Sequence, residues 1–287
     1  MAGWTVSVDH PVVADSEVSR TLSPADLRAL QRGAVDGSLE LLYQPEIDLA
    51  SGMIAGMEAL LRWRCPPLGR LTPPEFLDLA LQGEALVPIG SWVLRTAAAE
   101  AASWLKLDGP QRRLWINVST TDLVAPEFPD QVAAVLGEHR LSFGAVGLEV
   151  AEFSVAVLGE RAVPVLTALR EAGAALAIDD SSSWIATLGA IAELPVDAVK
   201  LGHRFVRGLA ADDHAASVLT VIKAAHAEGI KVVAEGVESQ QECARLTELG
   251  CDRAHGFLFA SPMLVAQARG LLRDSVRWPV LGRGATL

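Results

Sequence analysis

The stretch RAVPVLTALREAGAALAIDD, residues 161–180, holds one complete unit of a repeating pattern. Apolar residues recur at helical spacing up to Ala172, Gly173 closes the helix, and an apolar strand at 175–179 ends in two aspartates. A buried strand preceded by such a helix is the building block of a parallel α/β sheet. The stretch therefore predicts helices packed against a sheet of parallel strands.

The same pattern repeats along the rest of the chain, at intervals of roughly 25–35 residues. Further strands are expected at 41–47, 54–63, 114–118, 146–150, 198–201, 231–234 and 256–259. Further helices are expected at 24–36, from 73 onward, and at 90–107, 129–140, 185–194, 215–227, 240–249 and 265–276. So many units favour one closed barrel over two small doubly wound domains. We expect a tail or packing arm at 1–21, a barrel domain at 22–276 and a C-terminal tail at 277–287.

The composition of the 287 residues excludes several classes of partner. The chain carries 24 basic against 35 acidic residues, a net charge of −11, and 51% of its residues are hydrophobic. Such a chain repels nucleic-acid polymers and anionic membrane surfaces, although a single phosphate ligand can still bind through a local cation. No apolar run reaches the ~18 residues of a membrane span, the start lacks a signal-peptide pattern, and the three cysteines lack metal-ligand spacing. We expect a soluble, cytoplasmic protein.

The stretch GMEALLRWR, residues 56–64, places charges inside an otherwise apolar run. Alternation along a strand sends Glu58, Leu60 and Arg62 to one face and apolar side chains to the other. The polar face is either a solvated outer surface or the lining of a polar cavity.

The other predicted strands end in, or carry, polar groups that suit a metal ion or a phosphate. These groups are Asn117, Glu149, Asp179, Asp180, Lys200 and Glu235. In a barrel of parallel strands the C-terminal ends converge on one face, where active sites are found. A single carboxylate at such a position is usually a solvated loop residue. Polar groups at the same position on five strands would require five independent coincidences if none of them were functional. Glu58 would be a further member of this ring.

The residue types in the ring indicate a hard cation. Oxygen ligands without nearby histidine or cysteine ligands suit Mg²⁺ or Mn²⁺ better than zinc. The adjacent Asp179 and Asp180 could serve two ions about 3.5–4 Å apart, as in phosphodiester cleavage. Arg62 is either a phosphate contact or a solvated surface arginine, and His255 either faces the site or is a hydrogen-bonded structural histidine.

Eight blocks of sequence resemble the EAL domain family of cyclic-di-GMP phosphodiesterases in the same order. The blocks are YQPEIDL at 43–49, EALLRW at 58–63, INVS at 116–119, LEVAE at 148–152, AIDD at 177–180, LPVDAVKL at 194–201, VVAEGVES at 232–239 and GCDRAHGFLF at 250–259. The resemblance runs from about residue 22 to 270. It implies an α/β fold, a modified TIM (β/α)8 barrel, that hydrolyses one phosphodiester bond of cyclic di-GMP to give linear pGpG.

The resemblance also implies roles for single residues. Two Mg²⁺ or Mn²⁺ ions would be held by Glu58, Asn117, Glu149, Asp179, Asp180 and Glu235. The catalytic residues would be Lys200, Glu235 and Glu58, with Lys200 acting on the water or the phosphate. Cyclic di-GMP would be contacted by Gln44, Arg62, Asp180 and His255. Glu152 would brace the loop after the aspartate pair, and the partner besides cyclic di-GMP would be a second copy of the chain.

Several positions depart from the family pattern. The family has a loop with the sequence Asp-Asp-Phe-Gly-Thr-Gly. In this chain Ser181, Ser182, Ser183 and Trp184 replace its last four residues, so both glycines are missing. Ala151, Gly202 and His255 replace the usual Thr, Asp and Gln. The loop change weakens the expectation of a homodimer and could slow the enzyme. The alternative is an inactive domain that binds cyclic di-GMP or a regulatory protein partner. The intact ring favours the enzyme.

Overall fold

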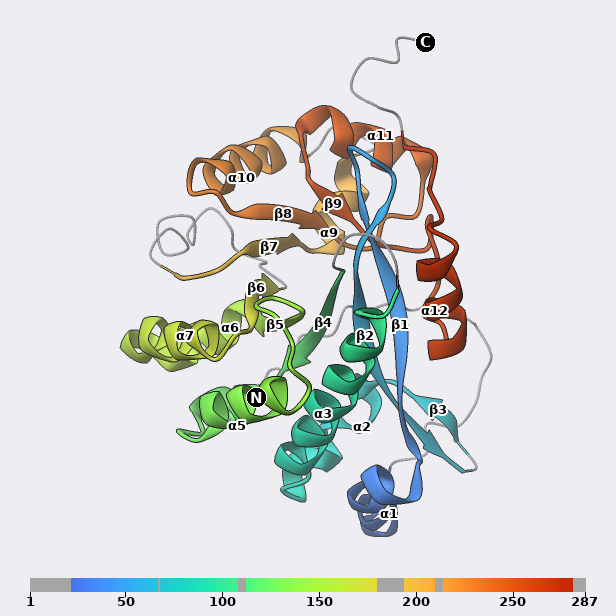
Figure 1. Cartoon of the computed structure of the whole chain (residues 1–287), viewed down its shortest axis with the longest axis vertical. Coiled ribbons are helices and arrows are strands. Elements are labelled where there is room, and N and C mark those ends of the chain that lie inside the picture. Colours follow the sequence, from blue (N-terminus) through green and yellow to red (C-terminus); the bar gives the residue numbers. More distant parts are fainter. Residues whose placement is uncertain (1–21, 67, 108–111, 180–193, 210–213, 281–287) are drawn as a thin grey trace.

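Eight strands close into a barrel in the computed structural model, which describes residues 22–66, 68–107, 112–179, 194–209 and 214–280 (Figure 1). The sheet order is β1-β9-β8-β7-β6-β5-β4-β2-β3, and β1 also pairs with β2, so the ring is complete and β3 lies outside it. The strands are β1 Leu39–Asp48, β2 Ile54–Cys65, β3 Gly69–Leu71, β4 Arg113–Val118, β5 Val146–Ala151, β6 Ala175–Asp179, β7 Ala198–Leu201, β8 Lys231–Ala234 and β9 Arg253–Ala254.

Helices surround the barrel (Figure 1). They are α1 Pro24–Asp36, α2 Pro73–Gln82, α3 Leu86–Trp104, α4 Thr120–Val124, α5 Phe128–Glu138, α6 Glu152–Leu158, α7 Ala162–Glu171, α9 His203–Gly208, α10 Ala215–Ala227, α11 Gln240–Leu249 and α12 Val265–Arg273. Local sequence sets their ends: Ser23 and Asp26 form a capping box at the start of α1, and Gly37 ends it at φ 75°. No helix in the described ranges is long and apolar enough to cross a bilayer.

Two hydrophobic cores follow from the alternation of side chains along the strands. The larger core lies between the strands and the helices and includes Met57, Ala59, Leu61 and Trp63, the apolar face of β2. The smaller core lies inside the barrel. It consists of Trp115, Ala175, Ala177, Ala198 and Val233. The opposite face of β2 carries the buried Glu58, so this polar face lines the barrel rather than the solvated outside.

The strand β1 departs from the expected parallel barrel because it runs antiparallel to both of its neighbours. It pairs with β2 over nine registered residues and with β9 over only two, Ile47 with Ala254 and Asp48 with Arg253. The connection to β2 is too short for a parallel crossover, which needs a dozen or more residues. Gly52 at φ 71° makes this turn possible, and Ser51 caps it by donating to Asp48.

Two other expectations need correction or addition. The run at 256–259 is a turn and not a strand, because β9 ends at Ala254 and Gly256, at φ 150°, packs its backbone against Val237. The helices α4, α6 and α9 and the strand β3 were not anticipated from the sequence. The expected helix at 185–194 lies outside the described residues, except for its last position.

One glycine inside the barrel supports a test of this packing. A Cβ at Gly147 would overlap the six-membered ring of Trp115, which is buried beneath it. We expect Gly147→Ala to lower the free energy of unfolding by about 1–3 kcal/mol, the usual cost of overpacking a core. Urea denaturation measures it.

The control for this substitution is Gly137→Ala. Gly137 lies near the end of α5, and among the described residues an added Cβ would meet nothing within 4 Å apart from its own chain neighbours and helix backbone. There the change should leave stability unchanged or raise it by about 0.5–1 kcal/mol, since alanine favours a helix. Equal effects at the two positions would contradict the packing described for Trp115.

Candidate active site

A ring of polar side chains lies at one end of the barrel, directly above the small inner core. Residues two apart on a strand share a face, so on each of five strands an inward residue at the level of the inner core is followed, two positions later, by an inward polar residue. The pairs are Trp115 and Asn117 on β4, Gly147 and Glu149 on β5, Ala177 and Asp179 on β6, Ala198 and Lys200 on β7, and Val233 and, just past β8, Glu235. Parallel strands bring all of these C-terminal ends to the same mouth of the barrel.

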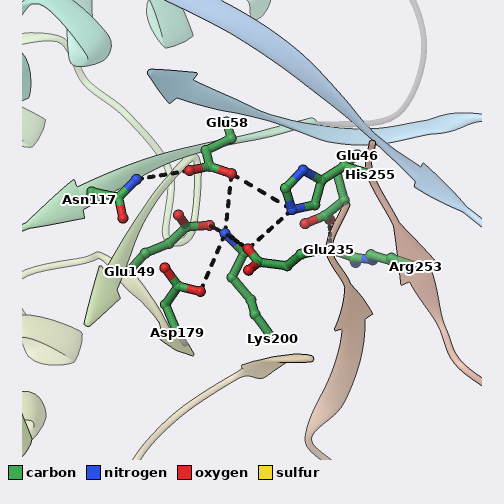
Figure 2. Close-up of polar contacts among 9 residues, drawn as sticks. All are labelled: Glu46, Glu58, Asn117, Glu149, Asp179, Lys200, Glu235, Arg253 and His255. Carbon is green, nitrogen blue, oxygen red and sulfur yellow. Dashed lines mark hydrogen bonds and ion pairs between the residues drawn. The ribbon is translucent and has the colours of Figure 1, made fainter. Parts of the chain in front are cut away.

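Lys200 lies at the centre of this ring, as Figure 2 shows. Its Nζ atom is 2.6 Å from Oε1 of Glu235, 2.9 Å from Oε1 of Glu149 and 3.2 Å from Oε2 of Glu58. Asp179 is slightly further away, with Oδ1 at 3.9 Å. The lysine is only 2% exposed, so a single ammonium group holds four carboxylates together away from bulk water.

Two further side chains complete the cluster (Figure 2). Asn117 donates from Nδ2 to Oε1 of Glu58 over 2.8 Å. His255 follows β9 and is fixed by its backbone N–H, which donates to the carbonyl of Ala234. Its Nε2 atom lies 3.2 Å from Oε1 of Glu235 and 3.8 Å from Oε2 of Glu58. The imidazole therefore faces the ring.

The carboxylates do not share their charge equally. Burial alone would raise the pKa of Glu235, but Lys200 and His255 outweigh burial and lower it to about 2. The pKa of Glu58 is likewise lowered, because Lys200 and His255 outweigh burial. Burial and the negative charge of Glu58 instead raise the pKa of Glu149 well above its usual value. The negative charge of the ring is therefore carried more by Glu58 and Glu235 than by Glu149.

The same four carboxylates keep Lys200 protonated. Burial favours the neutral amine, but the surrounding negative charges outweigh it and raise the pKa of Lys200 well above its usual value. A hydrogen bond to Glu235 likewise raises the pKa of His255 against the effect of burial. Lys200 is thus a fixed positive charge and not a proton acceptor at neutral pH.

The donor set fits a divalent cation. Glu58, Glu235 and His255 each offer a ligand atom, and these atoms lie within 4.8 Å of one another. Oε2 of Glu149 is buried and has no hydrogen-bond partner among the described residues. Four carboxylates around one ammonium leave an excess negative charge that a hard cation with oxygen ligands would neutralise.

The sequence model of the EAL domain matches residues 27–262 of the chain. The chain belongs to the EAL domain family. The tripeptide that names the family, Glu58-Ala59-Leu60, lies on β2 with its glutamate in the ring. The resemblance stated from the sequence blocks, and the modified TIM-barrel fold that it implied, are thereby confirmed.

Related proteins agree with this assignment. A cyclic di-GMP phosphodiesterase of Pseudomonas aeruginosa is 39% identical over 235 residues, which cover 81% of this chain but 40% of that protein. An uncharacterized protein of Mycobacterium tuberculosis is 38% identical over 259 residues and is matched over 84% of its length, with 88% of this chain covered. The chain thus spans less than half of the Pseudomonas protein.

Solved structures show the same architecture. The PaMucR phosphodiesterase in complex with c-di-GMP superposes with a TM-score of 0.79 at 33% identity, covering 85% of this chain and 99% of that one. The EAL domain of Mycobacterium smegmatis DcpA gives a TM-score of 0.71 at 36% identity, covering 84% and 100%.

The remaining expected site residues of this EAL domain lie around the ring or outside the described residues. Gln44 pairs with Glu58 across the β1–β2 ladder, is buried, and donates from Nε2 to the carbonyl of Ala260. Arg62 is half-buried on the same face of β2 as Glu58 and donates to the carbonyl of Leu61. Glu152 begins α6. Asp180 and the Ser181–Trp184 segment lie outside the described residues.

Proposed function

We propose that this EAL domain is a phosphodiesterase that uses Mg²⁺ or Mn²⁺ to hydrolyse one phosphodiester bond of cyclic di-GMP, giving linear pGpG. The observation that carries the proposal is the buried ring of four carboxylates around Lys200 at the C-terminal mouth of the barrel. The relatives named as cyclic di-GMP phosphodiesterases support the choice of substrate.

In this proposal a pair of ions is held by the oxygen ligands of Glu58, Asn117, Glu149, Asp179, Asp180 and Glu235. Bound ions of this kind supply a nucleophile at neutral pH and neutralise charge on the phosphate. His255, which faces Glu58 and Glu235, would contact the substrate or contribute a nitrogen ligand. Gln44 and Arg62 would position the dinucleotide, Arg62 through the paired N–H groups that match a phosphate. Glu152 would brace the loop after Asp180.

The reaction transfers a phosphoryl group to water. An oxygen–phosphorus bond forms, the bond from phosphorus to one ribose 3′ oxygen breaks, and the phosphate remains on the 5′ side, as the name pGpG requires. Glu235 is ionised at neutral pH and would accept the proton of the attacking water, and the released ribose 3′ oxygen would take up a proton from the solvent to become a hydroxyl group. Lys200 stays protonated and would stabilise the water or the negative charge that develops on the phosphate oxygens.

The test is a product assay on the purified chain. Incubation of the wild type with cyclic di-GMP and excess Mn²⁺ should give pGpG on chromatography, and chelation with EDTA should stop the reaction. Glu58→Ala removes a member of the ring and should lower turnover by about 10²-fold or more. The matched control is Glu138→Ala on the exposed end of α5, which should act like the wild type.

A receptor is the second candidate, favoured by the sequence Ser181–Trp184 in place of the glycine-containing family loop. In that case cyclic di-GMP binds without turnover, and the domain acts through a regulatory protein partner. Binding with unchanged substrate would support the receptor and overturn the enzyme. For either role we propose residues 22–276 as the functional unit, working in the cytoplasm as a homodimer, which sedimentation analysis can test.

A further inference from the structure

A second group of charged residues lies at the opposite, N-terminal mouth of the barrel. Arg113 is the first residue of β4 and Arg253 the first of β9, whereas the ring around Lys200 lies at the other strand ends. Arg113, Trp115 and Asn117 share one face of β4, so Trp115 separates Arg113 from the active-site mouth. A pocket of about 220 Å³ opens here, lined by Ala55, Arg113, Phe143, Gly144 and Arg253.

The guanidinium of Arg113 is held in one orientation. Its Nε donates to the carbonyl of Gly144 over 2.9 Å, and its Cζ lies 4.8 Å from the centre of the Trp115 ring. Gly144 has a φ of 71°, and a Cβ there would lie 2.8 Å from Nη2 of Arg113. The backbone at this position therefore passes close to the guanidinium, and a larger residue would disturb it.

The two terminal nitrogens of Arg113 are left without a partner. Within the described residues neither forms a hydrogen bond or an ion pair, and neither is a fully buried atom. The neighbouring arginines differ, because Arg253 pairs with Glu46 over 2.8 Å and Arg170 pairs with Asp197 over 2.9 Å.

The result is an uncompensated positive charge in a chain whose net charge is −11. Three arginines face two carboxylates in this cluster, an excess of one positive charge. Burial and the adjacent Arg253 and Arg170 lower the pKa of Arg113, against the opposing effect of Asp197 and Glu46. An arginine nevertheless remains charged in proteins, so an anion in the pocket would relieve this repulsion.

We propose that this pocket is an anion site that takes one phosphate group, bound by the two terminal nitrogens of Arg113 and assisted by Arg253. The planar guanidinium matches a phosphate through two parallel N–H···O bonds, and its stacking on Trp115 fixes the plane before the anion arrives. The volume suits a single phosphate group, either free or as the end of a larger phosphomonoester. The site is independent of the hydrolysis proposed above.

The test uses the indole N–H of Trp115, which is buried and has no hydrogen-bond partner among the described residues. Inorganic phosphate is added to the ¹⁵N-labelled full chain at constant ionic strength, with sodium chloride as the comparison salt, and the indole N–H signals are followed by NMR. The signal that is missing in Trp115→Phe is the signal of Trp115. We expect a saturable shift of the Trp115 signal with phosphate but not with chloride. Arg113→Gln should weaken the binding at least tenfold, and Arg113→Lys, which keeps the charge without the paired N–H groups, should give an intermediate affinity.

The matched control is Arg95→Gln, which removes the same charge from an exposed ion pair with Glu138 and should not alter the titration. A parallel titration with GMP distinguishes the source of the phosphate group. Saturation with phosphate alone assigns the pocket to the free anion, and saturation with GMP extends it to monoesters. A response that does not saturate, or that is the same in Arg113→Gln, overturns the proposal.

Discussion

Replacing Lys200 with methionine is expected to lower the free energy of unfolding of the metal-free chain by about 3–5 kcal/mol, the cost of breaking a buried ion pair. The same change should lower turnover of cyclic di-GMP by about 10²–10³-fold. The physical reason is that Lys200 is the central cation among Glu58, Glu149, Asp179 and Glu235. Without it, the four side chains must either repel one another or bind protons.

The pH dependence of this variant separates lost charge from lost packing. Without Lys200 the buried carboxylates would have folded-state pKa values above their unfolded ones, so the folded state would bind more protons than the unfolded state. Stability would then fall as the pH rises, most steeply above the unfolded value of about 4.3. Urea denaturation between pH 5 and 8 measures the trend, and excess Mn²⁺ should stabilise the variant more than the wild type.

A suitable control for Lys200→Met is Lys223→Met, an exposed lysine on α10. Its unfolding free energy should stay within about 0.5 kcal/mol of the wild type. If Lys200→Met proved as stable as this control at pH 8, the central position of the ammonium group would be contradicted.

The second large effect is expected at Glu149, where glutamine should abolish stabilisation by Mn²⁺ without destabilising the metal-free chain. The pKa of Glu149 is raised in the folded state, first by burial and then by Glu58. A raised pKa stabilises the fold below the unfolded value of about 4.3, and this contribution is lost as the pH rises through the folded value. Glutamine resembles the protonated form at every pH, so the metal-free variant should match or exceed the wild type at pH 7–8.

Glu235→Gln is the matched control because its pKa moves in the opposite direction, to about 2. A lowered pKa stabilises the fold above the unfolded value, and this contribution is lost only as the pH falls towards 2. At pH 7 Glu235→Gln should therefore destabilise the metal-free chain while Glu149→Gln does not. Thermal unfolding with EDTA and with Mn²⁺ measures both, and equal destabilisation would contradict the unequal charges of the ring.

The ring could be predicted from the sequence because it depends on two simple periodicities. Polar residues at the ends of apolar strands, with alternation along each strand, suffice to bring Asn117, Glu149, Asp179, Lys200 and Glu235 to one mouth. The central position of Lys200 could not be predicted, since it depends on side-chain distances that no spacing encodes. The arginine pocket was missed for a related reason: Arg113 and Arg253 meet only through the barrel closure.

The errors in the fold have identifiable causes. The antiparallel direction of β1 could have been predicted from the sequence, because the turn to β2 is too short to connect two parallel strands. The start of α4 could also have been predicted from the sequence, because Ser119 and Asp122 have the spacing of the capping box that they form. The helix α6 had none, because it begins at Glu152 directly after β5 without a loop. Residues 256–259 were mistaken for a strand because short apolar runs do not distinguish strands from turns.

The closure of the ring between β1 and β9 also sets an order of events during synthesis. Ile47 can pair with Ala254 only after residue 254 has been synthesised. One edge of β1 therefore remains unpaired until β9 has been made. Open edges invite pairing with other chains, and charges and proline on such a strand discourage it. β1 carries Glu40, Pro45, Glu46 and Asp48. Such residues discourage pairing with other chains for as long as this edge of β1 is open.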